Sequence, residues 1–204
     1  MKNQKGLLII FTRNPEPGKV KKRLAARIGD SAALELYKFL LKHTFEVTKD
    51  MSCDKVIYYS ESIEKEDIWD HNIFQKKKQS GKDLGERMKN AFTEGFEAGY
   101  SNIVIIGSDL YDLQKEDLEK AFSSLYNYDY AVGPAQDGGY YLLGMKSLNS
   151  KLFRNKKWGT DTVLQETLQD LKNEQLKLLE ERNDIDTYED LIEHPELHRI
   201  IKYP

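Results

Sequence analysis

The chain has very little cysteine: Cys53 is the only one among 204 residues. A single thiol can form no disulfide within the chain, and without neighbouring cysteine or histidine residues it makes no zinc site. We therefore expect Cys53 to pack as an apolar side chain in the core or at a strand edge. A domain of this length buries roughly 70% of the surface of its unfolded chain, so packing alone can hold it together.

Long apolar runs and a basic excess are also missing. The apolar run nearest the amino terminus, 6–11, is short for a signal peptide and far too short to span a membrane. The 31 basic and 34 acidic residues give a formal net charge of −3, which disfavours a general nucleic-acid binder. We expect a cytoplasmic protein that binds neither membrane nor nucleic acid.

What the sequence does contain is an alternation of strand and helix patterns. Uninterrupted apolar segments at 6–12 and 103–107 predict central parallel strands that are buried on both faces. Weaker patterns predict further strands at 55–60, 72–75, 128–133, 139–145 and 176–179. A helical pattern starts in the basic stretch 19–27, and helices are predicted at 31–49 (capped by Ser31), 83–95 (capped by Asp83), 114–125, 160–172 and 187–193.

This order predicts the fold class. Strands and helices alternate over the first 125 residues, which favours an α/β fold with a doubly wound, mostly parallel sheet. The adjacent strands 128–133 and 139–145 predict a small antiparallel addition at one side. Without a repeat, a low-complexity tract or a linker, we expect residues 1–204 to form a single domain.

Ligands of such sheets bind beyond the carboxyl ends of the strands, and the first segment there is basic. It runs from Arg13 to Arg23 and joins a proline- and glycine-containing loop to several cations, including Lys21, that could clamp a polyphosphate. It matches neither a Walker A loop nor a GxGxxG fingerprint. A solvated basic helix face is the alternative interpretation.

A second segment presents a carboxylate directly after an apolar strand. Asp109 follows the strand 103–107 and is well placed to bind Mg²⁺ or Mn²⁺, which take oxygen ligands and bridge to phosphate oxygens. The alternative is a cap of the helix that begins near Gln114. We favour the metal for Asp109 and the cap for Asp112.

Two later segments carry further carboxylates. Asp137 precedes Gly138 and Gly139, whose backbone can approach a ligand closely, although a simple hairpin turn explains the same residues. Asp184 and Asp186 lie two residues apart in a segment predicted to be extended, and only one of them is expected to face the site. We choose Asp186. The residues from Thr187 onward otherwise resemble the start of a helix.

Several long motifs follow one another nearly from end to end of the chain. They are Phe11-x-Arg13-x-Pro15-x-Pro17-Gly18, Lys21-x-Arg23-Leu24, Gly81-x-Asp83-Leu84-Gly85-Glu86-Arg87-Met88, Gly107-Ser108-Asp109, Gly133-Pro134-Ala135-x-Asp137-Gly138-Gly139-Tyr140-Tyr141, Trp158-x-Thr160 and Asp184-x-Asp186-Thr187-x-Glu189-Asp190-Leu191. In this order they resemble the glycosyltransferase-A-like DUF2064 family of bacterial proteins, which includes arsenosugar-biosynthesis glycosyltransferases. The molybdenum-cofactor and phospholactate guanylyltransferases are more distant relatives.

The resemblance implies a nucleotide-diphospho-sugar transferase fold and a role for each motif. The residues implied to hold phosphates are Arg13, Lys21 and Arg23. Those implied to hold a Mg²⁺ or Mn²⁺ ion are Asp109 and Asp186. The segment implied to line the base or ribose pocket includes Gly81, Asp83 and Arg87. The residues implied to face the sugar or acceptor are Asp137, Gly138, Gly139 and Trp158. Two positions depart from the family pattern: Tyr111 replaces a proline, and Lys22 replaces a threonine.

The expected function is the metal-dependent transfer of a sugar from a nucleotide sugar to a small acceptor, with Asp109 and Asp137 as catalytic residues. Asp137 would be the base that takes a proton from the acceptor. Two alternatives remain: nucleotidyl transfer onto a phosphorylated small molecule, and non-catalytic nucleotide binding. The oligomeric state, including a homodimer, is left open.

Overall fold

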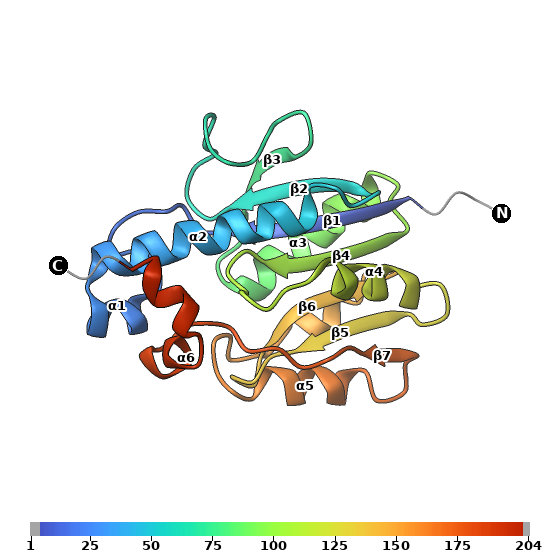
Figure 1. Ribbon diagram of the computed structural model, residues 1–204. Coiled ribbons are helices and arrows are strands. Elements are labelled where there is room, and N and C mark those ends of the chain that lie inside the picture. Colours follow the sequence, from blue (N-terminus) through green and yellow to red (C-terminus); the bar gives the residue numbers. More distant parts are fainter. Residues whose placement is uncertain (1–4, 202–204) are drawn as a thin grey trace.

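The computed structural model describes residues 5–201, and its strands form one seven-stranded sheet (Figure 1). The strands are β1 (Gly6–Thr12), β2 (Asp54–Tyr59), β3 (Gln75–Lys78), β4 (Asn102–Gly107), β5 (Tyr130–Pro134), β6 (Tyr140–Met145) and β7 (Leu176–Leu178). Their order in the sheet is β3-β2-β1-β4-β6-β5-β7. Of the neighbouring pairs in this sheet, β6 runs antiparallel to both β4 and β5, and the others are parallel. The predicted fold class is confirmed.

Helices cover both faces of the sheet. They are α1 (Lys22–Ile28), α2 (Asp30–Thr48), α3 (Leu84–Glu97), α4 (Lys115–Ser124), α5 (Val163–Asp170) and α6 (Tyr188–Ile192), with short 3₁₀ turns η1 (Ser150–Phe153) and η2 (Pro195–Arg199). Side chains of α2 and α4 pack on one face, and those of α3 and η1 pack on the other. None of the helices between residues 5 and 201 is both long and apolar enough to span a membrane.

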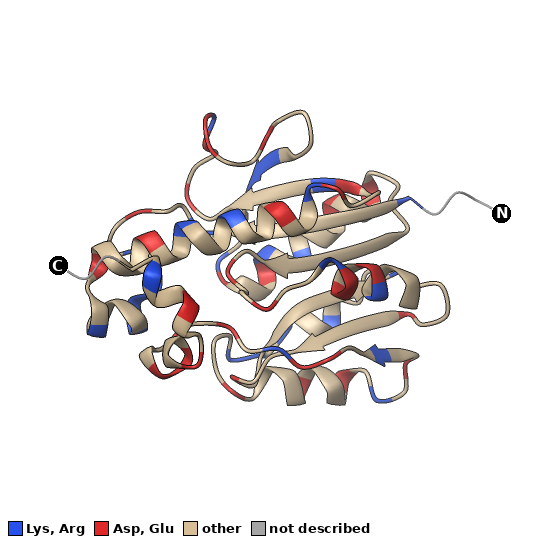
Figure 2. Ribbon diagram, in the orientation of Figure 1, with Lys and Arg blue, Asp and Glu red and all other residues tan. Residues whose placement is uncertain are grey.

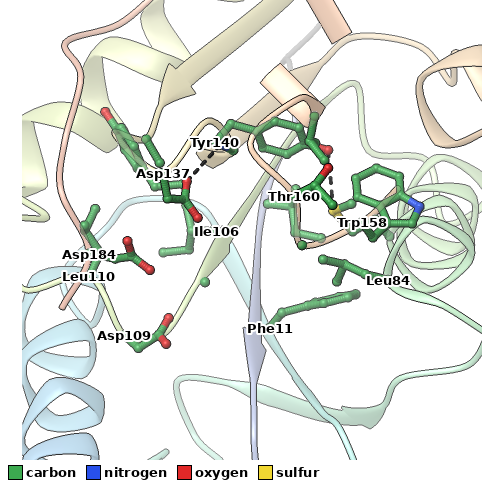
Figure 3. Close-up of a pocket in the computed structure, with 18 residues that line it drawn as sticks. Phe11, Leu84, Ile106, Asp109, Leu110, Asp137, Tyr140, Trp158, Thr160 and Asp184 are labelled. Carbon is green, nitrogen blue, oxygen red and sulfur yellow. Dashed lines mark hydrogen bonds between the residues drawn. The ribbon is translucent and has the colours of Figure 1, made fainter. Parts of the chain in front are cut away.

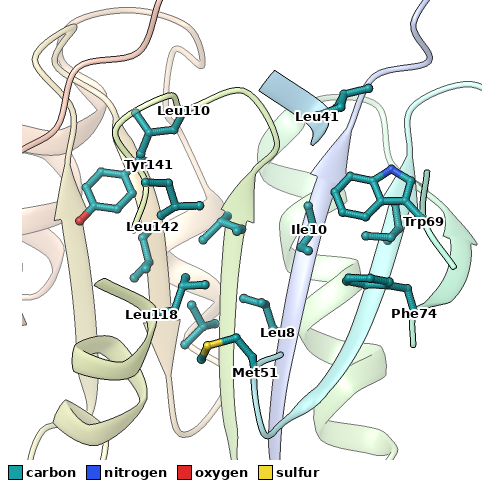
Figure 4. Close-up of a cluster of buried hydrophobic side chains, with 14 of the residues drawn as sticks. Leu8, Ile10, Leu41, Met51, Trp69, Phe74, Leu110, Leu118, Tyr141 and Leu142 are labelled. Carbon is teal, nitrogen blue, oxygen red and sulfur yellow. The ribbon is translucent and has the colours of Figure 1, made fainter. Parts of the chain in front are cut away.

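The uninterrupted apolar sequence of β1 follows from this two-sided cover. Leu8 and Ile10 belong to the core on the α2 side, which also holds the side chains drawn in Figure 4. Leu7 and Ile9 belong to the core on the α3 side. Successive strand residues point to opposite faces, so a strand buried on both faces is apolar at every position. Figure 2 accordingly shows few charges on the central strands and a basic edge strand, β3.

The carboxyl-terminal segment returns from β7 to the α1–α2 pair. A third cluster joins Leu24 of α1 and Leu36 of α2 to Ile185, Leu191 and Leu197, all of them almost fully buried. Figure 1 shows this segment crossing from β7 to α6, beside α1. The packing of Ile185 therefore brings its neighbours Asp184 and Asp186 to the carboxyl ends of the central strands.

Several element boundaries differ from the prediction. The third strand is β3, so the predicted 72–75 is wrong except at Gln75. An edge strand of lysines has no apolar pattern to reveal it. Ser31 is not a cap, because α2 begins at Asp30 with Gly29 at its N-cap. Asp112 is not a cap either: Gln114 caps α4 in a capping box with Asp117.

Cys53 packs against the core on the α2 side, next to β2, as predicted. Burial raises the pKa of its thiol to about 11. A thiol that stays protonated at neutral pH is a poor nucleophile.

Candidate functional site

The ends of β1 and β4 place two of the predicted site residues at one rim. Phe11 of β1 lies opposite Gly107 of β4 in the parallel register. Arg13 and Asp109 follow these two residues by two positions each, so both emerge at the carboxyl edge of the sheet. This is the location that the sequence predicted for them.

The hydroxyl of a buried tyrosine, Tyr37, contacts the ends of both strands. The Tyr37 hydroxyl accepts a hydrogen bond from the Arg13 backbone N–H at 2.9 Å and lies 3.4 Å from the hydroxyls of Thr12 and Ser108. Ser108 also donates to Thr12 at 3.1 Å. Tyr37 is buried in the core on the α2 side. Its hydroxyl gave no sequence signal, because its partners lie in distant segments.

Lys21 links two of the predicted carboxylates. Its Nζ lies 2.8 Å from an Asp109 oxygen and 3.4 Å from an Asp186 oxygen, with only 2% of the side chain exposed. Its backbone is left-handed, with φ 45° and ψ 47°, a conformation that non-glycine residues rarely adopt. Such strain persists where the surroundings enforce it, which is common at functional sites.

The charges of this cluster stabilise one another. Burial alone would lower the pKa of Lys21, but the carboxylates of Asp109 and Asp186 raise it above its usual value. Burial alone would raise the pKa of Asp109, but Lys21 and Arg13 hold it below its usual value. Lys21 is thus a cation and Asp109 an anion at neutral pH. Arg23 adds a second ion pair to Asp186.

A cavity of about 240 Å³ opens beside this cluster (Figure 3). One side carries the carboxylates of Asp109, Asp137 and Asp184. The other side is apolar and aromatic, with Phe11, Leu84, Tyr140 and Trp158. Met88, whose sulfur lies 3.9 Å from the Tyr140 hydroxyl, also lines the cavity. The cavity therefore joins a charged rim to an apolar wall.

The two aspartates of the carboxyl-terminal segment have different surroundings. Asp184 lines the cavity, whereas Asp186, the residue chosen from the sequence, binds Lys21 and Arg23. Burial raises the pKa of Asp184 to about 6; Lys21 acts against this, and the carboxylates of Asp109 and Asp186 add to it. The alternative interpretation of the residues from Thr187 onward, the start of a helix, is correct: Thr187 caps α6 in a capping box with Asp190.

The segment from Gly81 to Arg87 lies beside Trp158. Arg87 donates to the carbonyl oxygen of Gly81 at 3.1 Å, and Asp83 caps α3, as predicted, by accepting from Glu86 N–H. A Cβ on Gly85 would lie 2.3 Å from the Trp158 indole nitrogen. The absence of a side chain at Gly85 thus lets the indole pack on the start of α3.

The turn that carries Asp137 is both a hairpin and part of the cavity wall. It joins the antiparallel strands β5 and β6, and Asp137 accepts from the backbone N–H of Gly139 at 2.8 Å. Gly138 has φ 84°, and a Cβ there would lie 2.2 Å from the Asp161 carbonyl oxygen. The turn therefore packs closely against the segment that precedes α5.

Arg182 holds this turn in place and was not identified from the sequence. It pairs with the buried carboxylate of Asp117 at 2.8 Å, and its backbone exchanges hydrogen bonds with Pro134 and Gln136. Arg182 also lies two residues before Asp184 in the sequence. A lone arginine in a polar stretch gives no sign of such a partner 65 residues away.

Comparisons with known proteins place the chain. A family model described as an uncharacterized protein conserved in bacteria, DUF2064, matches residues 43–160. The chain belongs to the DUF2064 family. A structure from Desulfovibrio desulfuricans G20, provisionally named a nucleotide-diphospho-sugar transferase, is 31% identical, covers 95% of this chain and 96% of its own, and superposes with a TM-score of 0.82.

More distant structures share the fold of this family member. A cytidylyltransferase from Leptospira borgpetersenii is 18% identical, with 93% of this chain and 84% of the other covered and a TM-score of 0.56. The protein Rv0371c from Mycobacterium tuberculosis H37Rv, solved in complex with manganese, is 10% identical, with 97% and 98% covered and a TM-score of 0.58. No protein of curated function matches the sequence.

The donor set suits a hard divalent cation. Within residues 5–201, no group of three or more His, Cys, Asp or Glu side chains forms a ready-made metal site. Mg²⁺ and similar ions, however, are commonly held by one or two carboxylates together with substrate phosphates and water. Asp109 and Asp186, which share Lys21, supply two such carboxylates, so the residues fit an ion that arrives with a nucleotide.

The raised pKa of Asp184 leads to a prediction about stability. In the folded state its pKa is about 6, against 3.8 ordinarily, so the ionised form costs stability above pH 6, and most of this cost is lost as pH falls to 4. Each unit of pKa corresponds to about 1.4 kcal/mol, which partial exposure reduces. We expect Asp184→Asn to stabilise the metal-free protein by about 1–2 kcal/mol at pH 7.5.

Urea denaturation in EDTA at pH 7.5 and at pH 4 measures this effect. Most of the gain should be lost at the lower pH, because Asp184 is then protonated in the folded state and only about half ionised in the unfolded state. Asp50→Asn, on the exposed surface, is the matched control. An equal gain at both pH values would contradict the electrostatic cause.

Proposed function

We propose that the protein is a metal-dependent glycosyltransferase that transfers a sugar from a nucleotide sugar to a small acceptor. The observation that carries the proposal is the meeting of Lys21, Arg23, Asp109 and Asp186 at one rim beside the apolar cavity. The coarser assignment, a transferase that uses a nucleotide or a nucleotide sugar, is supported by the family and by the fold of its relatives.

The basic residues would bind the phosphates of the donor. Arg13, Lys21 and Arg23 all lie in the segment that follows β1. Charge-assisted hydrogen bonds from arginine and lysine side chains to phosphate are strong. Negative charge develops on the departing phosphate when the sugar bond breaks, and fixed cations in a partly dry cleft stabilise it. This is the principal task of the protein's own side chains.

The divalent ion would be held by Asp109 and Asp186. When bound, it supplies further neutralisation of the leaving phosphate. The manganese complex of Rv0371c supports the choice of Mn²⁺ or Mg²⁺. Gly81, Asp83 and Arg87 would line the base or ribose pocket, since their segment borders the cavity at Leu84.

Asp137 would act as the base for the acceptor. Its carboxylate lies on the cavity wall and is oriented by the Gly139 N–H. It would take the proton of an acceptor hydroxyl as the oxygen attacks the sugar carbon. Gly138, Gly139 and Trp158 would bound the space for the sugar and the acceptor.

A thermal-shift screen tests the donor. A ligand at about 100 times its Kd adds about 2.7 kcal/mol of stability, which raises the Tm of a protein of this size by roughly 5–10 °C. We expect a nucleotide sugar or nucleoside diphosphate to give this shift with Mn²⁺ and to lose most of it in EDTA. An equal shift in EDTA would argue for metal-independent binding instead.

The products decide between the two kinds of transfer. Glycosyl transfer releases a nucleoside diphosphate or monophosphate, whereas nucleotidyl transfer onto a phosphorylated acceptor releases pyrophosphate. Incubation of the stabilising nucleotide with candidate acceptors, followed by separate assays for each product, identifies the reaction. Pyrophosphate as the released product would replace the glycosyltransferase assignment by the nucleotidyltransferase.

A further inference from the structure

The cavity beside the phosphate-binding rim has a marked charge pattern. Its lining includes three carboxylates, those of Asp109, Asp137 and Asp184. No lysine, arginine or histidine is among the described residues that line it. Figure 3 shows the three carboxylates on one side, facing Phe11, Leu84 and Trp158 on the other.

The cations of the site are paired with Asp109 and Asp186 and do not line the cavity. Lys21 Nζ is tied to Asp109 and Asp186, and Arg23 is tied to Asp186. Asp186 itself does not line the cavity. The site is therefore polarised: its positive charge lies at the rim proposed to bind the nucleotide phosphates, and its negative charge lies in the cavity.

Binding of a divalent ion leaves this polarity in place. An ion on Asp109 and Asp186 neutralises those two carboxylates, while Asp137 and Asp184 still face the cavity. Two like charges at about 4 Å repel each other strongly near a protein surface, far more than in bulk water. A phosphate group placed in the cavity would meet this repulsion, whereas a hydroxyl or an ammonium group would be hydrogen-bonded.

The opposite wall suits an apolar body. Leu84, Met88 and Trp158 present apolar surface, and Phe11 and Tyr140 add two more aromatic rings. Aromatic faces bind apolar ring faces by burial and attract cations through their quadrupole. A wall of this kind next to carboxylates is complementary to a molecule with an apolar face and an uncharged or positive end.

We propose that the cavity takes an acceptor that carries no phosphate: a small molecule with an apolar face against Trp158 and a neutral or cationic polar end at Asp137 and Asp184. This rests on the proposed transferase function and sets its substrate class. The acceptor is then glycosylated on a hydroxyl, and nucleotidyl transfer onto a phosphate ester is disfavoured by the same charges.

Quenching of tryptophan fluorescence by ions measures the electrostatic field in the cavity, and the experiment does not require that the acceptor be identified. The chain has two tryptophans, Trp69 and Trp158; Trp69 is buried in the core and is not among the residues that line the cavity. In a Trp69→Phe variant, Trp158 is the sole reporter. Quenching by caesium and by iodide is compared in EDTA at equal ionic strength, each relative to free N-acetyltryptophanamide.

We expect caesium to be favoured over iodide by about twofold or more, because the cavity concentrates cations. Asp137→Asn in the same background should reduce this preference, while Asp50→Asn, on the exposed surface, should not. Iodide quenching that equals or exceeds caesium quenching would overturn the proposal. So would a preference that Asp137→Asn leaves unchanged.

A matched set of sugars tests the acceptor class directly. Glucose, glucosamine and glucose 6-phosphate share one body and differ in charge. Titrated against Trp158 fluorescence, glucose 6-phosphate should bind at least about tenfold more weakly than glucosamine. Equal or tighter binding of the phosphate ester contradicts the proposal. These readings need neither nucleotide nor metal, so a failed donor screen and a failed acceptor prediction remain distinguishable.

Discussion

Replacement of Asp109 by asparagine is expected to abolish metal-dependent nucleotide binding and to lower transferase activity about 10²–10³-fold. The shape of the side chain is kept, but its negative charge is lost. The carboxylate that would bind the ion and that pairs with Lys21 at 2.8 Å disappears in one step. Calorimetric titration of nucleotide, with and without Mn²⁺, measures the first effect, and product release measures the second.

The control for this experiment is Asp112→Asn, on the same loop and also half-buried. Like Asp109→Asn, this substitution removes one negative charge, but it does so three residues further along the chain. We expect nucleotide binding and activity within about twofold of the parent protein, as is usual for surface substitutions. Unaltered metal-dependent binding in the Asp109→Asn variant would remove Asp109 from the site.

Replacement of Asp117 by alanine is expected to destabilise the protein by about 3–5 kcal/mol. Asp117 is 1% exposed and pairs with Arg182 at 2.8 Å. Its removal leaves a largely buried guanidinium without its main partner. It also removes the capping box at the start of α4, where Asp117 accepts from the Gln114 backbone N–H. Urea denaturation at neutral pH measures the loss.

Two further variants separate the ion pair from the local helix effect. Glu119→Ala, on the exposed side of α4 and 3.6 Å from Lys115, should cost less than about 1 kcal/mol. Arg182→Met in the Asp117→Ala background should recover part of the loss, because the unpaired charge is then gone. A double variant no more stable than Asp117→Ala would show that the pair is not the source of the effect.

Arg182 also connects stability with the site. Its backbone pairs with Pro134 and Gln136, which directly precede Asp137 in the turn, and two residues later the chain reaches Asp184. Loosening of Arg182 in the Asp117→Ala variant should therefore disturb two of the three carboxylates of the cavity, those of Asp137 and Asp184.

The sequence by itself determined the architecture and the edge of the sheet at which the site lies. The segments 6–12 and 103–107 contain no charged residue and are apolar throughout their centres, which requires strands covered on both faces and leads to a parallel sheet with helices on each side. Loops that follow such strands collect at their carboxyl ends, so Arg13 and Asp109 could be placed together from their spacing after the strands. Local signals also sufficed for the Asp83 cap of α3 and for the hairpin at Asp137.

Only the tertiary structure decided which side chains meet. Residues two apart on an extended segment share a side, so periodicity could not separate Asp184 from Asp186. The packing of Ile185 against α1 and α2 brings Asp184 to the cavity and Asp186 to Lys21. The pairs Lys21–Asp109, Tyr37–Arg13 and Arg182–Asp117 join segments 24 to 88 residues apart. The lysine-rich edge strand β3 is likewise defined by its pairing with β2. Periodicity in a sequence reports the face of an element, whereas contacts, charges and pKa values depend on partners that only the folded chain brings within a few ångströms.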